Sequence, residues 1–151
     1  MQVICLDVNV LVYAHRQDMP EHPEAKAFLE ELASGDKAFA VPEMAFSSLV
    51  RIVTQSSFKP PSAVEQALDF CNAVISAPRC SVLRPSENHW GIFERVCRAT
   101  GARGKLVADA YLATFAIDRD DEWVTTDRDF RKFPGLRWRL LGERHARLNP
   151  R

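Results

Sequence analysis

Three aspartates stand where carboxylates could do chemistry together. Asp7 ends the apolar run VICLD, Asp127 follows the β-branched run EWVTT, and Asp109 lies inside the apolar stretch LVADAYLATFAID. Carboxylates that gather at one point repel one another unless a cation is bound. An all-oxygen set of ligands favours Mg²⁺, with Mn²⁺ as an alternative, over zinc. The three residues together predict a divalent metal site.

Asp109 is the hardest of the three to explain by structure alone. The residues three, four and seven positions further along its expected helix are all apolar, so its carboxylate is predicted to face the core. A lone buried charge is costly, and we identify no lysine or arginine nearby on that face. By contrast, Asp7 could cap the following helix and Asp127 could form an Asx-turn. The metal interpretation therefore depends on the three acids taken jointly.

The elements that must position these acids alternate along the chain. Strand-like runs occupy residues 3–7, 37–41, 80–85 and 122–126. Helical periodicity occupies residues 22–35, 42–53, 62–76 with Ser62 as its cap, 86–100 and 106–118. Single strands alternating with helices predict an α/β fold, a three-layer α/β/α domain around a central, mostly parallel sheet of about four to five strands. Ligands bind such sheets at the carboxyl ends of the strands, where Asp7 and Asp127 would lie.

The composition indicates one globular domain over residues 1–151, because the chain is 46% hydrophobic and has no repeat or linker. Its 20 Lys and Arg balance its 20 Asp and Glu, so any nucleic acid must be bound by a local patch. Arg103 and Lys105 in the loop GARGK are candidates for RNA contacts, as is the segment 128–151 with its eight Lys and Arg. The alternative is an ordinary loop and a solvated tail.

The cysteines and the apolar runs bear on the compartment. The four cysteines form no C-x-x-C pair and are expected to be reduced. No signal peptide is evident, and no apolar stretch approaches the roughly 20 residues that span a bilayer. We therefore expect a cytoplasmic protein with no membrane partner.

Three stretches in this order, LDVNVLVYA, VADAYLATFAI and VTTDRDFRKFPGLRW, resemble the PIN-domain ribonucleases, and specifically the VapC toxins of bacterial toxin–antitoxin pairs. The resemblance covers residues 1–140 and leaves 141–151 as a basic tail. It implies a Mg²⁺-dependent endoribonuclease that hydrolyses RNA phosphodiester bonds. It also implies inhibition by a VapB-type antitoxin and a homodimeric state.

The resemblance also implies roles for individual residues. It makes catalytic residues and metal ligands of the three acids, Asp7, Asp109 and Asp127. Thr125 opens the T-x-D motif that contains Asp127, and Asp129 is the companion acid two residues later. Asn9 holds a small polar position where its amide could orient a carboxylate or a water on the metal.

One feature departs from the family. Its members commonly carry a glutamate on the helix after the second strand, and that position falls here on Ser47 or Ser48. Glu43 lies one helical turn before Ser47, so a role for it through a bound water is expected. The alternative for Glu43 is an acid favoured by the helix dipole.

Other functions remain open at this stage. A catalytically weakened PIN-fold RNA-binding module would keep the fold and lack a ligand at Ser47 or Ser48. A metal-dependent phosphatase is suggested by the likeness of LDVNV to the nucleophile strand of haloacid-dehalogenase phosphatases, although Asn9 stands where they need a second Asp. A DNA nuclease is the third alternative, since related acid sites cut DNA.

Overall fold

A computed structural model describes residues 2–151. Its helices are α1 (Val8–His15), α2 (His22–Ser34), α3 (Glu43–Val53), α4 (Val64–Ile75), α5 (His89–Thr100), α6 (Lys105–Arg119) and the 3₁₀ helix η1 (Arg128–Lys132). Its strands are β1 (Ile4–Leu6), β2 (Phe39–Pro42), β3 (Cys80–Leu83), β4 (Glu122–Thr125), β5 (Arg137–Leu140) and β6 (Arg147–Leu148).

The strands form one sheet in the order β3-β2-β1-β4-β5-β6, in which β1 to β5 are parallel and β6 is antiparallel to β5. This confirms the predicted mostly parallel α/β sheet, with six strands instead of four or five. The chain proceeds outward from β1 to β3 and then returns to β4 on the other side of β1. The strand order therefore reverses between β1 and β4. In open α/β sheets, ligands bind at the carboxyl ends of the strands beside such a reversal.

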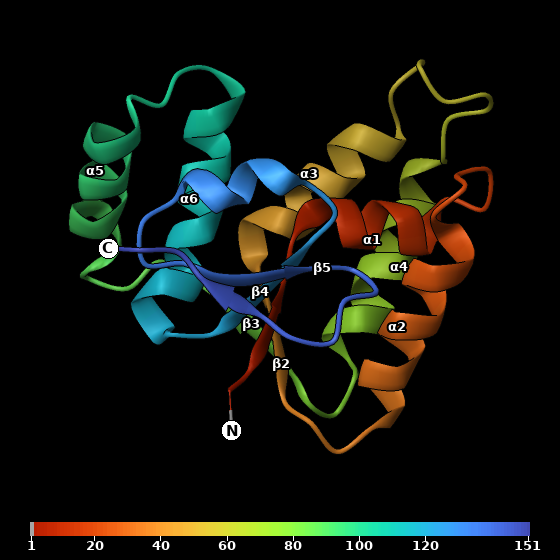
Figure 1. The fold of residues 1–151 in the computed structure, drawn as a ribbon. Helices are drawn as coiled ribbons and strands as arrows, with labels where there is room; N and C mark the ends of the chain where they lie inside the picture. Colours follow the sequence, from red (N-terminus) through yellow and green to blue (C-terminus); the bar gives the residue numbers. More distant parts are fainter. Residues whose placement is uncertain (1) are drawn as a thin grey trace.

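The helices cover both faces of the sheet. Figure 1 shows α5 and α6 on one side and α1, α2 and α4 on the other. Right-handed crossovers explain the division, because β1 to β3 advance in one direction and the crossover to β4 runs back in the other. With both faces covered, central strands must be apolar throughout, and every residue of β2 is buried.

The large side chains of the core lie mainly around β4 and β5. Trp123 and Trp138 are fully buried. Phe130 packs against Trp123 with ring centroids 5.4 Å apart, and Phe133 packs against Phe130 at the same distance. The part of the sheet that carries the last acid motif, β4 and the turn after it, is thus anchored by aromatic packing.

Two predicted helix boundaries had different outcomes. Gly101 ends α5 in a left-handed conformation (φ 65°), as its place in the sequence predicts. Ser62 does not cap α4, which begins at Val64 with Ala63 as the cap residue. Ser62 is buried instead and accepts a hydrogen bond from the Arg16 guanidinium at 3.1 Å.

The segment predicted as a basic tail is packed onto the domain. Residues Arg147–Leu148 form β6 along β5, and Arg147 lies over the Trp138 ring. Asn149 is buried: its amide donates to the carbonyls of Phe130 and Phe133, and its oxygen accepts from Trp138 Nε1. These contacts fix the segment and hold much of its charge close to the sheet edge.

Two further features concern the cysteines and the apolar character of the helices. Cys5, Cys71, Cys80 and Cys97 are all free. Among residues 2–151 no helix combines the length and the apolar character required to cross a membrane.

Candidate active site

Asp7 directly follows β1 at the point where the strand order reverses. Its backbone N–H donates to the carbonyl of Val124 at 3.0 Å, so the residue stays in register with β4. Its Oδ1 accepts from the N–H of Val8 at 2.7 Å and its Oδ2 accepts from Thr125 Oγ1 at 2.6 Å. Asp7 therefore caps α1, the structural alternative considered from the sequence, and it also lies at the rim of the sheet where the acids were predicted to meet.

Asp7 is almost completely buried, with 3% of its surface exposed. The pKa of this carboxyl is raised from 3.8 to about 7, mainly by burial and in part by the charge of Asp109, although the bonds from Thr125 and Val8 and the charge of Lys105 lower it. Within residues 2–151 no salt bridge reaches Asp7. The site thus holds a carboxyl whose ionised form lacks a direct cationic partner.

Asp127 follows β4 and is oriented by its neighbours. Its backbone N–H donates to Thr125 Oγ1 at 3.0 Å, and its Oδ1 accepts from the N–H of Asp129 at 2.8 Å. The second bond is the Asx-turn considered from the sequence. Because Thr125 also donates to Asp7, one hydroxyl links the acid after β1 to the turn after β4. Thr125 thus orients both acids.

Asp109 has a partner that the sequence interpretation missed. Lys105 Nζ lies 2.8 Å from Asp109 Oδ2 and 3.2 Å from Asp127 Oδ2. The expectation that no lysine would serve Asp109 is therefore wrong: residues i and i+4 share a helix face, and Lys105 precedes Asp109 by four positions. Lys105 also belongs to the acid cluster and does not merely flank it.

The charges around Lys105 act on one another. Burial raises the pKa of Asp109, and the charges of Asp127 and Asp129 add to this, while Lys105 opposes it. For Asp127 burial would also raise the pKa, but the hydrogen bond from Asp129 and the contact with Lys105 together lower it. Burial would lower the pKa of Lys105, yet its bonds to both acids raise it overall. Lys105 is therefore a firmly protonated cation between two carboxylates.

The three acids come from three different elements and are linked to one another, since Lys105 joins Asp109 to Asp127 and Thr125 joins Asp7 to the Asp127 turn. Carboxylate oxygens are ligands that suit a hard divalent cation. The Lys105 ammonium is hydrogen-bonded to two of these acids, so one cation already lies between Asp109 and Asp127. As they are arranged, no three His, Cys, Asp or Glu side chains in the described part of the chain could hold a metal ion alone. Mg²⁺ usually binds through one or two carboxylates and keeps several waters, so this arrangement is compatible with it.

Two of the predicted supporting residues, Asn9 and Asp129, lie next to the acids in the fold. Asn9 is half-buried in the first turn of α1, next to the Asp7 cap. Asp129 lies in η1, where its backbone orients Asp127 while its own carboxylate pairs with Lys132 at 3.6 Å. Both therefore stand beside the site.

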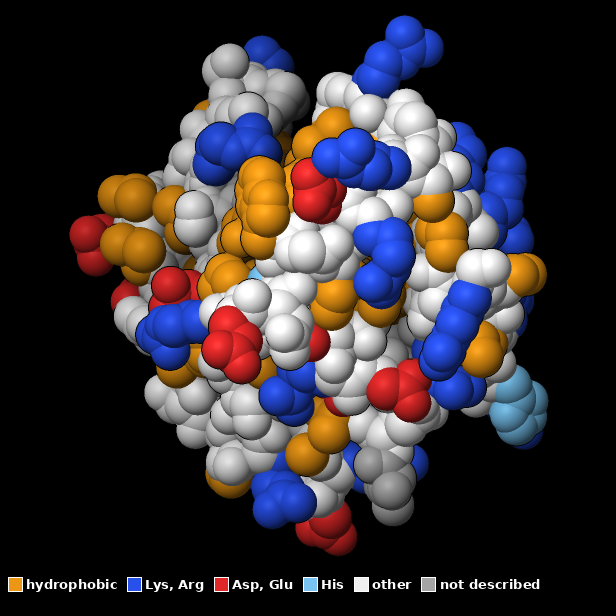
Figure 2. Space-filling model, turned by 90° about the vertical axis from the view of Figure 1, so that its left-hand side faces the viewer, with side chains coloured by type: hydrophobic (Ala, Val, Ile, Leu, Met, Phe, Trp, Pro, Cys, Tyr) orange, Lys and Arg blue, Asp and Glu red, His pale blue; other side chains and the backbone are white. Residues whose placement is uncertain are grey.

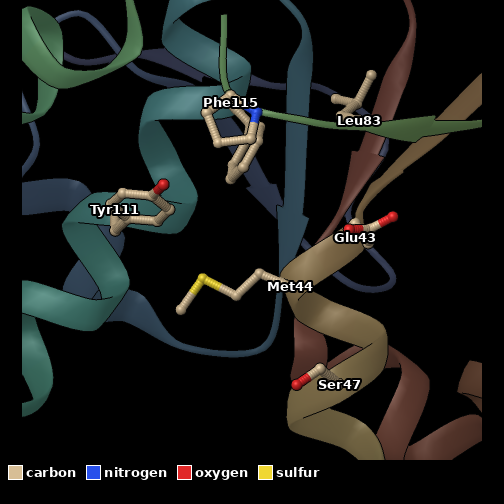
Figure 3. Close-up of a pocket in the computed structure, with 7 residues that line it drawn as sticks. Glu43, Met44, Ser47, Leu83, Tyr111 and Phe115 are labelled. Atoms are coloured by element: carbon tan, nitrogen blue, oxygen red, sulfur yellow. The ribbon is translucent and has the colours of Figure 1, made fainter.

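Glu43 is engaged elsewhere. It begins α3, and its carboxylate pairs with Arg84 at 2.6 Å, with both side chains more than half exposed. Figure 3 shows the Glu43 carboxylate pointing away from Met44, while the Ser47 hydroxyl points into the space between α3 and α6. That space is an apolar pocket of about 450 Å³ lined by Glu43, Met44, Ser47, Leu83, Pro85, Tyr111 and Phe115. The Arg84 partner was not identified from the sequence.

Among the described residues, Lys and Arg side chains do not gather into one basic patch on the face formed by α5 and α6. Figure 2 views this side, where Lys and Arg side chains are dispersed among hydrophobic, uncharged and acidic groups. Arg103 is exposed in the loop just before α6, two residues from Lys105. Of the two cations predicted to contact RNA, Arg103 is thus in the loop, whereas Lys105 is bonded to the acids.

Comparison with known proteins identifies the class of protein to which this fold belongs. Residues 4–136 match the PIN domain. The chain is 38% identical over 146 residues to VapC ribonuclease Mb2897 of Mycobacterium bovis, covering 95% of this chain and 99% of the relative. It is 34% identical to ribonuclease VapC31 of Mycobacterium tuberculosis, covering 87% of this chain and 94% of that one. The chain belongs to the PIN-domain family, among the VapC ribonucleases.

Solved structures have the same fold. VapBC2 of Rickettsia felis, bound to a DNA fragment from its promoter, gives a TM-score of 0.68 at 20% identity and covers 91% of this chain and 98% of that one. VapC20 of Mycobacterium tuberculosis, a toxin that cleaves the sarcin–ricin loop, gives 0.63 at 14% identity, covering 84% and 92%. At these identities the likeness concerns the fold.

Proposed function

We propose that this protein is a Mg²⁺-dependent endoribonuclease and the toxin of a VapBC-type pair. The observation that carries the proposal is the convergence of Asp7, Asp109 and Asp127 at the carboxyl ends of β1 and β4, in a chain of the VapC ribonuclease family. Asp109 and Asp127 already share one cation, and Asp7 is tied to the Asp127 turn through Thr125. Mn²⁺ is the expected substitute ion.

The chain's own residues prepare the site for phosphodiester hydrolysis. Val8 and Thr125 hold the Asp7 carboxylate in one orientation, and Asp129 does the same for Asp127. Such fixed carboxylates bind a cation without first having to be ordered. Mg²⁺ held there would offset charge on the phosphate and make a bound water more acidic. The carboxylates thus supply position and charge, and no histidine is required.

The proposed partners are RNA and a VapB-type antitoxin. Arg103, exposed beside the acid cluster, is the proposed phosphate contact. The antitoxin is supported by the solved VapBC complexes that share the fold, including VapBC-1 of Haemophilus influenzae at a TM-score of 0.64. A homodimer is also proposed.

Metal removal tests the function directly. The purified chain should cleave structured RNA internally in Mg²⁺ and lose this activity in EDTA, and restored Mg²⁺ or Mn²⁺ should recover it. Cleavage products are read on denaturing gels, with DNA of the same sequence and a phosphomonoester as parallel substrates. Preference for DNA would favour the DNA nuclease, release of phosphate from the monoester would favour the phosphatase, and RNA binding without cleavage would favour the weakened module.

A second test concerns Glu43, for which we propose an indirect role through a bound water. Glu43→Gln should raise the Mg²⁺ concentration needed for half-maximal cleavage by about 10-fold, the lower end for groups that orient metal ligands, because Arg84 already shares its charge. Ser47→Ala and Ser48→Ala should leave that concentration unchanged. Mg²⁺ titrations of the three variants measure this, and wild-type behaviour of Glu43→Gln would make Glu43 a helix-terminus acid only.

A further inference from the structure

Lys105 occupies the position in the acid cluster that a metal ion would need. Its ammonium donates to Oδ2 of Asp109, one turn along α6, and to Oδ2 of Asp127 in the turn after β4. The two acids belong to elements distant in the sequence, and this single side chain joins them. The Lys105 side chain is 71% exposed, whereas that of Asp109 is 12% exposed, so the ammonium covers the acids from the solvent side.

An ammonium and a divalent cation cannot use these oxygens together. Mg²⁺ binds carboxylate oxygens at about 2.0–2.1 Å and demands near-octahedral directions around itself. An ammonium that stayed hydrogen-bonded to the same Oδ2 atoms would lie within a few ångströms of the metal as a like charge. Metal binding at Asp109 and Asp127 must therefore displace the lysine.

The Lys105 side chain can leave the acids at little cost in free energy once a metal ion compensates their charge. Its four-carbon stem is flexible and its charge is well hydrated in water. Among the described residues the only hydrogen-bond partners of its side chain are Asp109 and Asp127, so release breaks no other side-chain hydrogen bond. Asp7, which Lys105 does not contact, remains in place through Thr125 and Val8.

We propose that the Lys105 ammonium is an internal counter-ion of the acid cluster, and that a divalent cation must displace it to load the site. This rests on the proposed function, since it concerns the same carboxylates. Lys105 stabilises the metal-free protein by compensating Asp109 and Asp127, and it weakens metal binding by competing for their oxygens. The residue thereby sets the metal concentration at which the site becomes loaded.

Metal affinity without RNA is the first readout. Isothermal titration of the full chain with MgCl₂ should give about 10-fold tighter binding for Lys105→Met than for wild type, within the range seen when groups contacting metal ligands are changed. Lys105→Arg, which keeps a cation able to bridge the acids, should bind as weakly as wild type. Arg103→Met is the matched control: it removes the same charge two residues earlier, and at about 0.15 M salt such exposed charges are screened over roughly 8 Å.

Thermal unfolding is the second readout, and it separates competition from a purely structural role. In EDTA, Lys105→Met should melt below wild type, because two acids lose their counter-charge. In saturating Mg²⁺ the difference should close or reverse. A variant that melts below wild type by the same margin in both conditions overturns the proposal, as does unchanged or weaker Mg²⁺ binding, or an equal gain for Arg103→Met.

The two proposals fail separately. Wild-type RNA cleavage that needs Mg²⁺, together with unchanged Mg²⁺ affinity in Lys105→Met, would overturn the displacement and leave the nuclease standing. Tighter Mg²⁺ binding by Lys105→Met, together with wild-type protein that cleaves no RNA, would support the displacement and overturn the nuclease.

Discussion

Asp109→Asn is expected to reduce RNA cleavage by at least about 100-fold, because loss of a carboxylate that holds the metal removes several kcal/mol of stabilisation of the transition-state charge. Asparagine has nearly the same shape, so the packing of α6 should persist. The neutral amide cannot replace the charge that, with Asp127, attracts a cation. Cleavage rates at saturating RNA and fixed Mg²⁺ measure the effect, and toxicity on expression should disappear in parallel.

The control for Asp109→Asn is Asp69→Asn, the same chemical change at an exposed position of α4. It should keep wild-type cleavage and toxicity. Circular dichroism and melting curves establish that both variants are folded. Full cleavage activity in folded Asp109→Asn would remove this residue from the site and would leave the acid cluster without its helix member.

Much of the fold could be predicted because its central elements carry strong local patterns. β1 and β4 arise from apolar runs, which predict strands buried on both faces. α6 arises from a stretch with helical periodicity, which predicts a helix with one buried face. The edge of the sheet could not be predicted in the same way. β6 has two residues, and it is held by the buried hydrogen bonds of Asn149 to Phe130 and Phe133, which leave no periodic signal.

The start of α4 failed for a related reason. Ser62 is a residue type that favours a helix cap, but its hydroxyl accepts from Arg16 and hydrogen-bonds with His15, both distant in sequence. The helix begins one residue later than such a cap would place it. Tertiary contacts here outweighed the local preference.

For the candidate site, the positions of the acids followed from topology and the position of the lysine did not. Parallel strands end at one rim, so Asp7 and Asp127 were expected close together, and the helical face of Asp109 pointed inward. Lys105 stands in the first turn of α6 after a glycine-containing loop, where a lysine usually remains in solvent. Its contact with Asp109 could be predicted from the four-residue spacing, but its contact with Asp127 depends on how the turn after β4 folds.

The acids therefore differ in how their charge is compensated. Asp109 and Asp127 share Lys105, whereas Asp7 is held by a hydroxyl and a backbone N–H. The Asp7 carboxylate is thus oriented by hydrogen bonds but has no cation bonded to it among residues 2–151. That difference makes Asp7 the position where function and stability are expected to oppose each other.

Asp7→Asn is accordingly expected to abolish cleavage and, without metal, to stabilise the protein at pH 8. The pKa of Asp7 rises from 3.8 to about 7 on folding, so the folded wild type keeps a proton that the unfolded chain has lost between these values. Wild-type stability attributable to Asp7 is thus fully present below pH 4, falls as the pH rises, and is lost above pH 7. Asparagine stays neutral and avoids that loss.

The expected gain at pH 8 is about 2–3 kcal/mol, somewhat below the roughly 4 kcal/mol that a shift of about 3 pH units represents, because the amide matches the bond from Thr125 less well. For a chain of this size that corresponds to a rise in Tm of about 5–10 °C. Melting curves in EDTA from pH 5 to pH 8 should show the gain growing with pH, while Asp69→Asn shows no such trend. A gain that does not change with pH, or a lower Tm for Asp7→Asn at pH 8, would mean that the buried Asp7 carboxylate costs the fold nothing.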